Sequence, residues 1–407
     1  MMNGKTNILL LAAAILPLAP SCLDNNVLGP DLPDEKIDFS WYANRPADGG
    51  TRANATYFVG GPGAAAERHL PVGTGFGVFG YFHPQHAGVA GSWTDNYSDN
   101  HPRLFYNEPV TVGSDGLAYT YTYSNSRYWP KNTLDRMSFI AYYPWNALDE
   151  DGSPNDDTVV EPFLDRHYER RGMIGFYYTV PSSADDAVDL MVSDLCMDQS
   201  YALWSSDHSQ GLTGNANGKV KFFFHHALSQ VRIKSINRGD VGSNEDVELK
   251  INYIAFNNVA VFGQCIPVPD DSHPSATGRV TVTPTWPAGS LSATRPDRTT
   301  GVSAHICYDE EHDSWDTDEI LLMIPHTFLP GATIEVNFDL KRKHGATGEY
   351  YNYLGNTLSA PLTTTAINGW AAGRIYNYNI TLNLHNIEAT AEVLPWLDAG
   401  EDVIMDN

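Results

Sequence analysis

Short segments in which apolar and polar residues alternate recur along the chain, and clusters of turn-forming residues separate them. Residues 36–42 (KIDFSWY) put Ile37, Phe39 and Trp41 on one face of an extended strand. Residues 73–82 (GTGFGVFGYF) are more continuously apolar and are a candidate for a core strand. Further strand candidates lie at residues 117–123, 137–143, 219–233, 247–262, 279–283, 319–324, 333–340 and 374–384.

The spacing of these segments predicts an all-β protein built of sandwiches. The candidates follow one another at intervals of roughly 8 to 20 residues, without the sustained 3.6-residue period that helices between strands would show. The polar, glycine-rich stretch at residues 209–219 (SQGLTGNANGK) is the best candidate for a boundary. We therefore expect an N-terminal β-sandwich over residues 36–210 and a C-terminal β-sandwich over residues 218–407.

The composition supports this class of protein and excludes others. Of the 407 residues, 42% are hydrophobic, which excludes wholesale disorder. The 22 Tyr, 16 Phe and 9 Trp among 34 Gly and 25 Pro favour strands and turns over helices. The chain has 25 Lys and Arg against 49 Asp and Glu, a net charge of -24, whereas a surface that binds phosphate needs clustered basic residues. We therefore expect no nucleic-acid partner.

The first 22 residues have the pattern of an export signal. Lys5 precedes an apolar run over residues 8–18, which is too short to span a bilayer but suits a secretory signal peptide. The run ends in small residues before Cys22, which resembles a bacterial lipobox and predicts lipidation of the Cys22 thiol. The alternative is an ordinary signal peptide with a chance cysteine. Residues 23–35 then form a flexible tether in this interpretation.

One motif matches the dinucleotide-binding fingerprint in glycine spacing but not in the residues around the glycines. Gly75, Gly77 and Gly80 have the G-x-G-x-x-G spacing, but that chemistry needs the glycines in a turn that opens a helix. The intervening residues are aromatic or β-branched, and Tyr81 and Phe82 continue the apolar pattern. We interpret this segment as a strand, so the motif predicts no cofactor.

Other candidates for chemistry are equally weak. Residues 149–157 and 309–319 are acidic and could hold calcium at the surface, although the first lacks the glycine of an EF-hand loop and solvated loops explain both. His225 and His226 are adjacent on a strand, so their rings point to opposite faces and do not easily share one metal ion. We find no nucleophile or metalloprotease motif, and no pair of carboxylates stands out in so acidic a chain. We therefore predict no catalytic, metal or cofactor residues.

The remaining cysteines are Cys196, Cys265 and Cys307. Three is an odd number, and no C-x-x-C spacing occurs, so neither a disulfide framework nor a zinc site is indicated. Small buried thiols are the simplest interpretation. An exported chain could still pair two of them, and the sequence leaves that choice open.

Taken in order, a set of motifs resembles the fimbrillin family of Bacteroidetes, the type V pilins and their Mfa1-like relatives. The match runs through nearly the whole mature chain, and its most specific part is the pair Tyr128-Trp129-Pro130 and residues 138–144 (SFIAYYP). His326 is a departure, because relatives often have Gln there. The other motifs are Asp38-Phe39 with Thr51-Arg52-Ala53, Gly75-Phe76-Gly77-Val78-Phe79, Asp189-Leu190-Met191, residues 224–229 (FHHALS), Ile324-Pro325-His326, residues 370–378 (WAAGRIYNY) and Val393-Leu394-Pro395-Trp396.

The resemblance implies two tandem transthyretin-like, Greek-key β-sandwich domains and a mechanism of strand exchange. A protease would cut after Arg52, while Arg45 is a weaker candidate because Pro46 follows it. The strand at residues 36–42 would leave, and the C-terminal segment of a neighbouring subunit would fill its groove. The predicted donor residues are Ile387, Ala389, Ala391, Val393 and Trp396.

The resemblance implies a structural or tip subunit of an adhesive fimbria, exported as a lipoprotein to the cell outer membrane and exposed at the surface. Its partners would be other fimbrial subunits, the outer membrane through its lipid, and a host glycan or protein. Three alternatives stay open: an uncleaved anchor lipoprotein, a monomeric surface lipoprotein that binds glycan or protein, and an enzyme with a cleft that the sequence does not reveal. In a monomer, both terminal segments would stay as permanent strands.

Overall fold

The structure is a computed structural model of the chain. It describes residues 36–42, 72–94, 101–114, 119–132, 134–148, 159–164, 173–181, 186–200, 219–238, 247–270, 279–294, 321–343, 350–365, 367–383 and 385–396. Within these ranges, regular structure consists of strands and two short 3-10 turns, so the predicted all-β class is confirmed. No helix in this part of the chain has the length and apolar character needed to span a bilayer.

The elements follow one another in an order that agrees with the predicted strands. The predicted ranges 36–42, 73–82 and 137–143 overlap the strands β1, β2 and β5, with limits that differ by one or two residues. The strands are β1 (Asp38–Tyr42), β2 (Gly75–His83), β3 (Phe105–Ser114), β4 (Tyr119–Thr122), β5 (Arg136–Tyr143), β6 (Val160–Leu164), β7 (Ile174–Thr179), β8 (Met191–Ser193), β9 (Leu195–Gln199), β10 (Lys219–His226), β11 (Ser229–Arg238), β12 (Val247–Asn257), β13 (Phe262–Pro269), β14 (Arg279–Val280), β15 (Val282–Thr285), β16 (Leu321–Met323), β17 (His326–Thr327), β18 (Thr333–Lys343), β19 (Tyr350–Pro361), β20 (Gly369–Trp370), β21 (Arg374–Leu382) and β22 (Ile387–Pro395), with the turns η3 (Ala288–Ser290) and η4 (Leu362–Thr365).

The first sheet has the order β1-β10-β8-β5-β2-β3-β4, and β9 joins it by pairing with β5 and β14. Its neighbouring strands are antiparallel except for β1, which runs parallel to β10. β1 therefore lies at one end of the sheet and β4 at the other. The first strand of the described chain is held by a strand that comes about 180 residues later in the sequence.

The other sheets have the orders β15-β13-β7-β6, β16-β11-β21-β22 and β12-β18-β19, and β17 pairs with β20. Strands from both sides of residues 209–219 share sheets, because β10 belongs to the first sheet and β13 pairs with β7. The limits of the two sandwiches, and their arrangement as tandem transthyretin-like domains, stay predictions.

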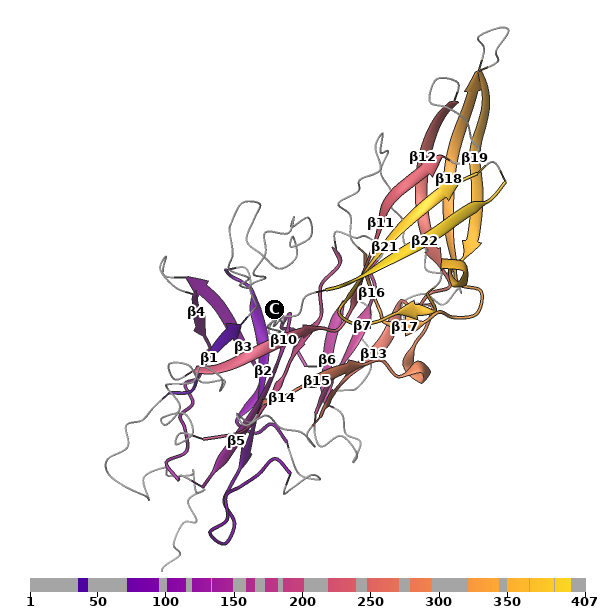
Figure 1. The fold of residues 1–407 in the computed structure, drawn as a ribbon. Coiled ribbons are helices and arrows are strands. Elements are labelled where there is room, and N and C mark those ends of the chain that lie inside the picture. The colour runs from indigo at the N-terminus through magenta and orange to yellow at the C-terminus, as the bar shows by residue number, and fades with distance from the viewer. Residues whose placement is uncertain are drawn as a thin grey trace, which may run out of the picture.

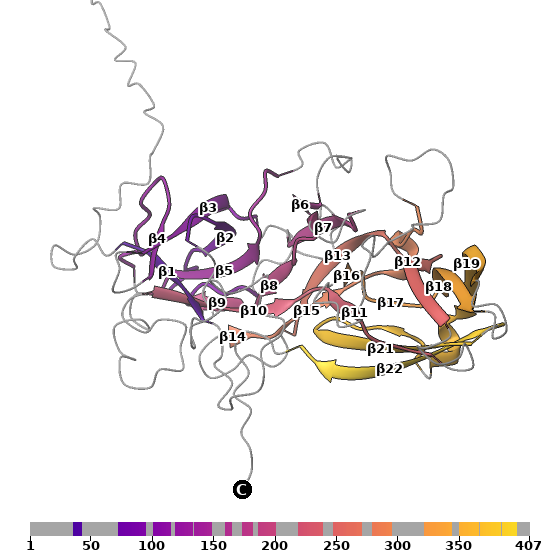
Figure 2. The same cartoon turned by 90° about the horizontal axis from the view of Figure 1, so that it is seen from above.

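The molecule is elongated (Figure 1). The strands β1 to β5 and β10 lie toward one end, and β12, β18, β19, β21 and β22 lie toward the other. The sheet that contains β6, β7 and β13 lies between these two groups, and the view from above gives the same order (Figure 2). In both views β22 points from the far end back toward the first sheet.

The central strands of the first sheet are buried on both faces, which explains their nearly continuous apolar sequence. In β2, Phe76 and Val78 face one cluster of buried side chains, while Phe79 and Tyr81 face the other. The first cluster, called here the N-terminal core, is closed by β1 and β10. It consists of Ile37, Phe39, Phe76, Val78, Phe105, Val110, Val112, Trp129, Met137, Phe139, Ala141, Met191, Cys196, Val220, Phe222 and Phe224.

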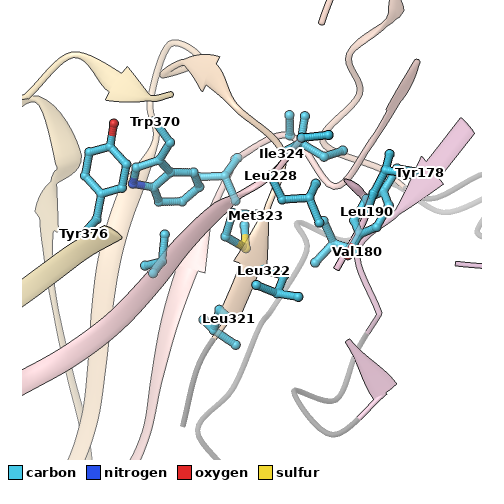
Figure 3. Close-up of a cluster of buried hydrophobic side chains, with 14 of the residues drawn as sticks. Tyr178, Val180, Leu190, Leu228, Leu321, Leu322, Met323, Ile324, Trp370 and Tyr376 are labelled. Atoms are coloured by element: carbon cyan, nitrogen blue, oxygen red, sulfur yellow. The ribbon is translucent and has the colours of Figure 1, made fainter. Parts of the chain in front are cut away.

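The second cluster is larger and continues from the first sheet to the far end of the molecule. Figure 3 shows its middle, where Tyr178 and Leu190 lie on one side of Met323 and Trp370 lies on the other. Because this core is continuous, the sheets are packed together by apolar burial rather than joined only by the chain.

Candidate functional site

The strand β1 lies at the edge of the first sheet and covers side chains of the N-terminal core, and the surface that it covers is called here the groove. Ile37 and Phe39 are buried, with 0% and 1% of their surface exposed, and both belong to the N-terminal core. Their spacing of two residues puts both side chains on the same face, as the sequence predicts. β1 is thus a short strand that contributes large side chains to a core built by other segments.

Phe39 is surrounded by aromatic rings. Its ring centroid lies 5.2 Å from that of Phe105, 6.0 Å from that of Phe139 and 5.6 Å from that of Phe222. The first two contacts are edge-to-face and the third is stacked, and these are the favourable geometries for aromatic pairs. If β1 left, these rings would line an apolar groove open to water.

Polar contacts fix the start of β1 in this groove. The backbone N–H of Ile37 donates to the carbonyl oxygen of Arg127 at 2.8 Å, and the hydroxyl of Tyr123 donates to the carbonyl oxygen of Ile37 at 2.6 Å. Burial raises the pKa of Tyr123 to about 12, so this hydroxyl keeps its proton at neutral pH and stays a donor. Lys36 forms an antiparallel bridge with Tyr128. β10 therefore pairs with β1 along one edge, and Arg127, Tyr123 and Tyr128 hold the two residues that directly precede β1.

The strand β22 is held differently. It pairs antiparallel with β21 along its whole length, from Ile387 opposite Leu382 to Pro395 opposite Arg374. Ile387 and Ala389 are buried against the larger core, but from Glu392 onward the side chains are exposed. Buried side chains and backbone hydrogen bonds therefore both hold the first half of β22. The second half is held mainly by backbone hydrogen bonds.

Two contacts hold the exposed end of β22. Lys234 on β11 bridges to Glu392 with an N–O distance of 3.0 Å. The indole ring of Trp396 stacks on the imidazole of His226, with a centroid distance of 3.7 Å and an interplanar angle of 14°. The second contact ties the C-terminal end of β22 to β10, which is the strand that also holds β1.

His225 and His226 each have a separate acidic partner, as expected for rings on opposite faces of β10. The Nε2 atom of His225 lies 2.6 Å from Oδ1 of Asp194, and Nδ1 of His226 lies 2.7 Å from Oδ2 of Asp189. Asp194 also bridges to Arg279 on β14, at 3.3 Å. In the described part of the chain, no group of His, Cys, Asp and Glu side chains could hold a metal ion.

Several of the predicted positions lie outside the described residues. These are Cys22, Arg52, Arg45, Cys307 and the two acidic clusters. The predicted donor residues all lie on β22 or directly after it: Ile387 and Ala389 are buried, Ala391 and Trp396 are half-buried, and Val393 is exposed. The structure thus brings these five residues together as one edge strand and its end.

Cys196 and Cys265 are buried thiols outside any disulfide, which confirms the simplest interpretation for these two. Burial raises the pKa of Cys196 to about 12, so its thiol is neutral and unreactive at physiological pH. The pKa of Cys265 is raised too, for the same reason. Neither residue has the exposure of a reactive cysteine, and at Cys196 the effect of burial on the pKa outweighs the opposing effect of Arg279.

The glycines of the G-x-G-x-x-G match lie in β2, as the sequence predicts, and two of them make room for aromatic rings. A Cβ on Gly77 would come within 2.1 Å of the Tyr142 ring, and a Cβ on Gly80 would come within 2.7 Å of the Phe105 ring. Both glycines are therefore required by packing in the first sheet.

His326 is a structural residue in the larger core. Its Nδ1 donates to the carbonyl oxygen of Ile324 at 2.7 Å, and its Nε2 accepts the backbone N–H of Ala260 at 3.2 Å. Burial lowers the pKa of His326, against a smaller opposing effect of the Ile324 carbonyl. The neutral ring can make both hydrogen bonds, so His326 joins two segments that are 66 residues apart.

Sequence reasoning did not find the second role of β10. The sequence presents His225-His226 as a weak metal pair and as part of a family motif, and it presents Trp396 as a donor residue and as part of another motif. The aromatic run before His225 signalled a core strand, but nothing in the sequence indicated that Trp396 lies on His226.

Comparison with known proteins gives the family. The model of the family described as fimbrillin-like matches residues 72–396. The fimbrium subunit Fim1C of Phocaeicola vulgatus is 23% identical over 364 residues, which cover 82% of this chain and 85% of that protein. The crystal structure of a fimbrial protein from Bacteroides vulgatus has the same fold, with a TM-score of 0.52 and 16% identity over 89% of this chain and 99% of that one. The chain belongs to the fimbrillin-like family.

Proposed function

We propose that this protein is a subunit of an adhesive cell-surface fimbria that polymerises by strand exchange. The observation that carries the proposal is the groove occupied by β1. Ile37 and Phe39 are almost completely buried in it, yet Phe39 belongs to a short strand at the end of a sheet and Ile37 directly precedes that strand. Removing β1 would expose a row of aromatic rings and the backbone edge of β10, which another strand could cover.

Removal of β1 would begin with proteolysis after Arg52, ten residues beyond the end of the strand. The chain would reach the outer membrane as a lipoprotein through Cys22, so the cut would also free the subunit from its lipid. Ile37, Phe39 and five paired backbone positions hold β1, but after the cut this contact joins two separate chains, so the processed fragment could dissociate and a donor segment could replace it.

The segment from Ile387 to Trp396 of a neighbouring subunit would fill the open groove. Its backbone would pair with β10, and its alternate side chains would enter the space left by Ile37 and Phe39. Each subunit would receive one segment and donate another, so the contact would be head-to-tail and would generate a filament. The partners would be other fimbrial subunits, and the filament would lie on the cell surface, where it could bind a host glycan or protein.

Limited trypsin digestion of the folded, full-length protein tests this proposal. We expect cleavage after Arg52 to produce a ladder of stable oligomers on unboiled gels, and the Arg52→Ala variant to remain monomeric. Deletion of residues 387–407 in a chain cleaved after Arg52 should abolish the ladder, because no donor remains. A cleaved, folded chain that stays monomeric would contradict strand exchange and favour a monomeric binding protein with two permanent terminal strands.

N-terminal sequencing of surface material separates a polymerising subunit from an anchor. A chain that starts at Ala53 supports the polymerising subunit. A chain that retains lipidated Cys22 indicates an uncleaved anchor that ends the filament at the membrane.

A further inference from the structure

The C-terminal end of β22 docks where β10 passes into β11. The backbone N–H of Trp396 donates to the carbonyl oxygen of Gly373 at 2.8 Å, and the N–H of Gly373 donates to the carbonyl oxygen of Leu228 at 2.9 Å. Leu228 lies between His226, the last residue of β10, and the start of β11. Trp396 is therefore joined by backbone and by its ring to the segment that connects the first sheet to the rest of the molecule.

The surface that receives Trp396 is rigid. His226 is 5% exposed and Asp189 is 2% exposed, and the hydrogen bond of 2.7 Å between them fixes the plane of the imidazole. A buried carboxylate is tolerated when it is paired and hydrogen-bonded, and it then orients its partner. The indole of Trp396 lies flat on this oriented ring.

The side chains just before Trp396 are exposed and contribute little buried contact to the end of β22. Val393 is 42% exposed and Leu394 is 38% exposed, and Pro395 is exposed as well. Strand ends with exposed side chains and an open edge detach most easily. Among the described residues of this segment, Trp396 is the one whose ring packs on β10.

We propose that Trp396, stacked on His226 as oriented by Asp189, is a latch that keeps the C-terminal segment on its own subunit before assembly. This inference rests on the proposed function, because a latch matters only for a segment that is later donated. His226 acts as a positioning residue that keeps the donor segment, residues 387–396, on its own subunit. The donor must break this stack before it can enter the groove of a neighbour.

Hydrogen exchange in the full-length, uncleaved protein tests the latch without any assembly. We expect amides of residues 387–396 to exchange roughly 2- to 10-fold faster in the His226→Ala variant, because a ring contact of this kind is lost. The matched control is His225→Ala, which removes the neighbouring ring on the opposite face and should leave β22 unchanged. Asp189→Asn keeps an acceptor for His226 and should preserve protection.

A second variant keeps the test decisive if His226→Ala does not fold. Trp396→Ala removes a half-buried side chain directly after β22 and should raise exchange in β22 by a similar factor, while Trp396→Phe retains a flat ring and should restore protection. Unchanged exchange in the folded variants that lack either ring would overturn the latch.

Assembly then separates this inference from the proposed function. After trypsin cleavage at Arg52, the His226→Ala protein should form its oligomer ladder sooner than the wild type. If exchange responds to the variants but no cleaved chain forms a ladder, strand exchange fails while the restraint on β22 stands. If ladders form at the same rate with and without His226, the latch does not limit donation and the proposal is wrong.

Discussion

The terminal strands β1 and β22 each lie at the end of a sheet, but different interactions hold them. β1 pairs through five residues and buries Ile37 and Phe39 among aromatic rings. β22 pairs through nine residues, and its inward side chains include the small Ala389 and Ala391. Side chains of a particular shape hold β1, whereas β22 is held mainly by backbone hydrogen bonds, with Ile387 and Ala389 buried at its start and the Trp396 ring stacked directly after its end.

This difference suits the roles proposed for the two strands. Backbone hydrogen bonds are the same for every strand, so a segment held mainly by them can leave one sheet edge and bind another with little loss. A large aromatic side chain fits one pocket and is costly to expose. We therefore expect β22 to detach from a folded subunit once the Trp396 stack is broken, whereas β1 should leave only after proteolysis cuts the chain behind it.

The largest expected effect comes from removing the ring that anchors β1. Phe39→Ala should destabilise the protein by about 3–5 kcal/mol, because it creates a cavity lined by aromatic rings. Val393→Ala on β22 is the matched control and should cost much less, since Val393 is exposed. Denaturant unfolding followed by aromatic fluorescence measures both, and equal losses would remove the distinction between the two strands.

Acid should weaken the part of the larger core that contains His326, at β17 and β20. His326 has a lowered pKa in the fold, so the unfolded chain binds a proton first as the pH falls below the ordinary value of 6.5. The contribution of neutral His326 to the free energy of unfolding is therefore fully present above pH 6.5. Below that pH it falls by at most about 1.4 kcal/mol per pH unit, until His326 in the folded protein also takes up the proton.

Hydrogen exchange at about pH 7.5 and about pH 5.5, corrected for intrinsic rates, measures this loss at β17 and β20. His326→Gln supplies an amide that can make both hydrogen bonds without titrating, so the acid effect of His326 should disappear. Equal acid sensitivity of this variant and the wild type would exclude His326 as the cause.

A smaller effect is expected for the hydrogen bond at the start of β1. Tyr123→Phe keeps the aromatic ring beside Phe39 but removes the donor to the carbonyl oxygen of Ile37, which should cost about 0.5–1.5 kcal/mol. Exchange in residues 37–42 should rise. Tyr128→Phe, at an exposed tyrosine, serves as the control, and an equal response of the two variants would argue against a specific role of Tyr123.

The smallest effect is expected for the ion pair on β22. Lys234 and Glu392 are both exposed, so solvent screens their attraction. Lys234→Met should leave the unfolding midpoint within the scatter of the measurement. A loss comparable to that of Tyr123→Phe would show that polar contacts hold β22 more firmly than its backbone pairing implies.

Much of the fold could be predicted from local patterns. The alternation of Ile37 and Phe39 predicts their burial on one face, and the continuous apolar character of residues 73–82 and 137–143 predicts strands in a core. The aromatic residues between the glycines of β2 predict a strand instead of a phosphate-binding turn. These features depend only on the period of a strand and on the residues within it.

The pairing of distant segments could not be predicted in this way. The parallel contact of β1 with β10, the hydrogen bonds of His326 to Ile324 and Ala260, and the stack of Trp396 on His226 join residues that are not recognisable as partners in the chain. A strand pattern shows which face is apolar, but any edge with free backbone groups can satisfy its hydrogen bonds.

The amino-acid sequence by itself determined the all-β class, the family and the two terminal segments that matter for the proposed assembly. Only the tertiary structure decided that both segments meet the same strand, β10, one through the groove at Phe222 and the other through His226. The physical reason is that periodicity and composition act within a segment, whereas sheet order and ring packing depend on how the whole chain closes its cores.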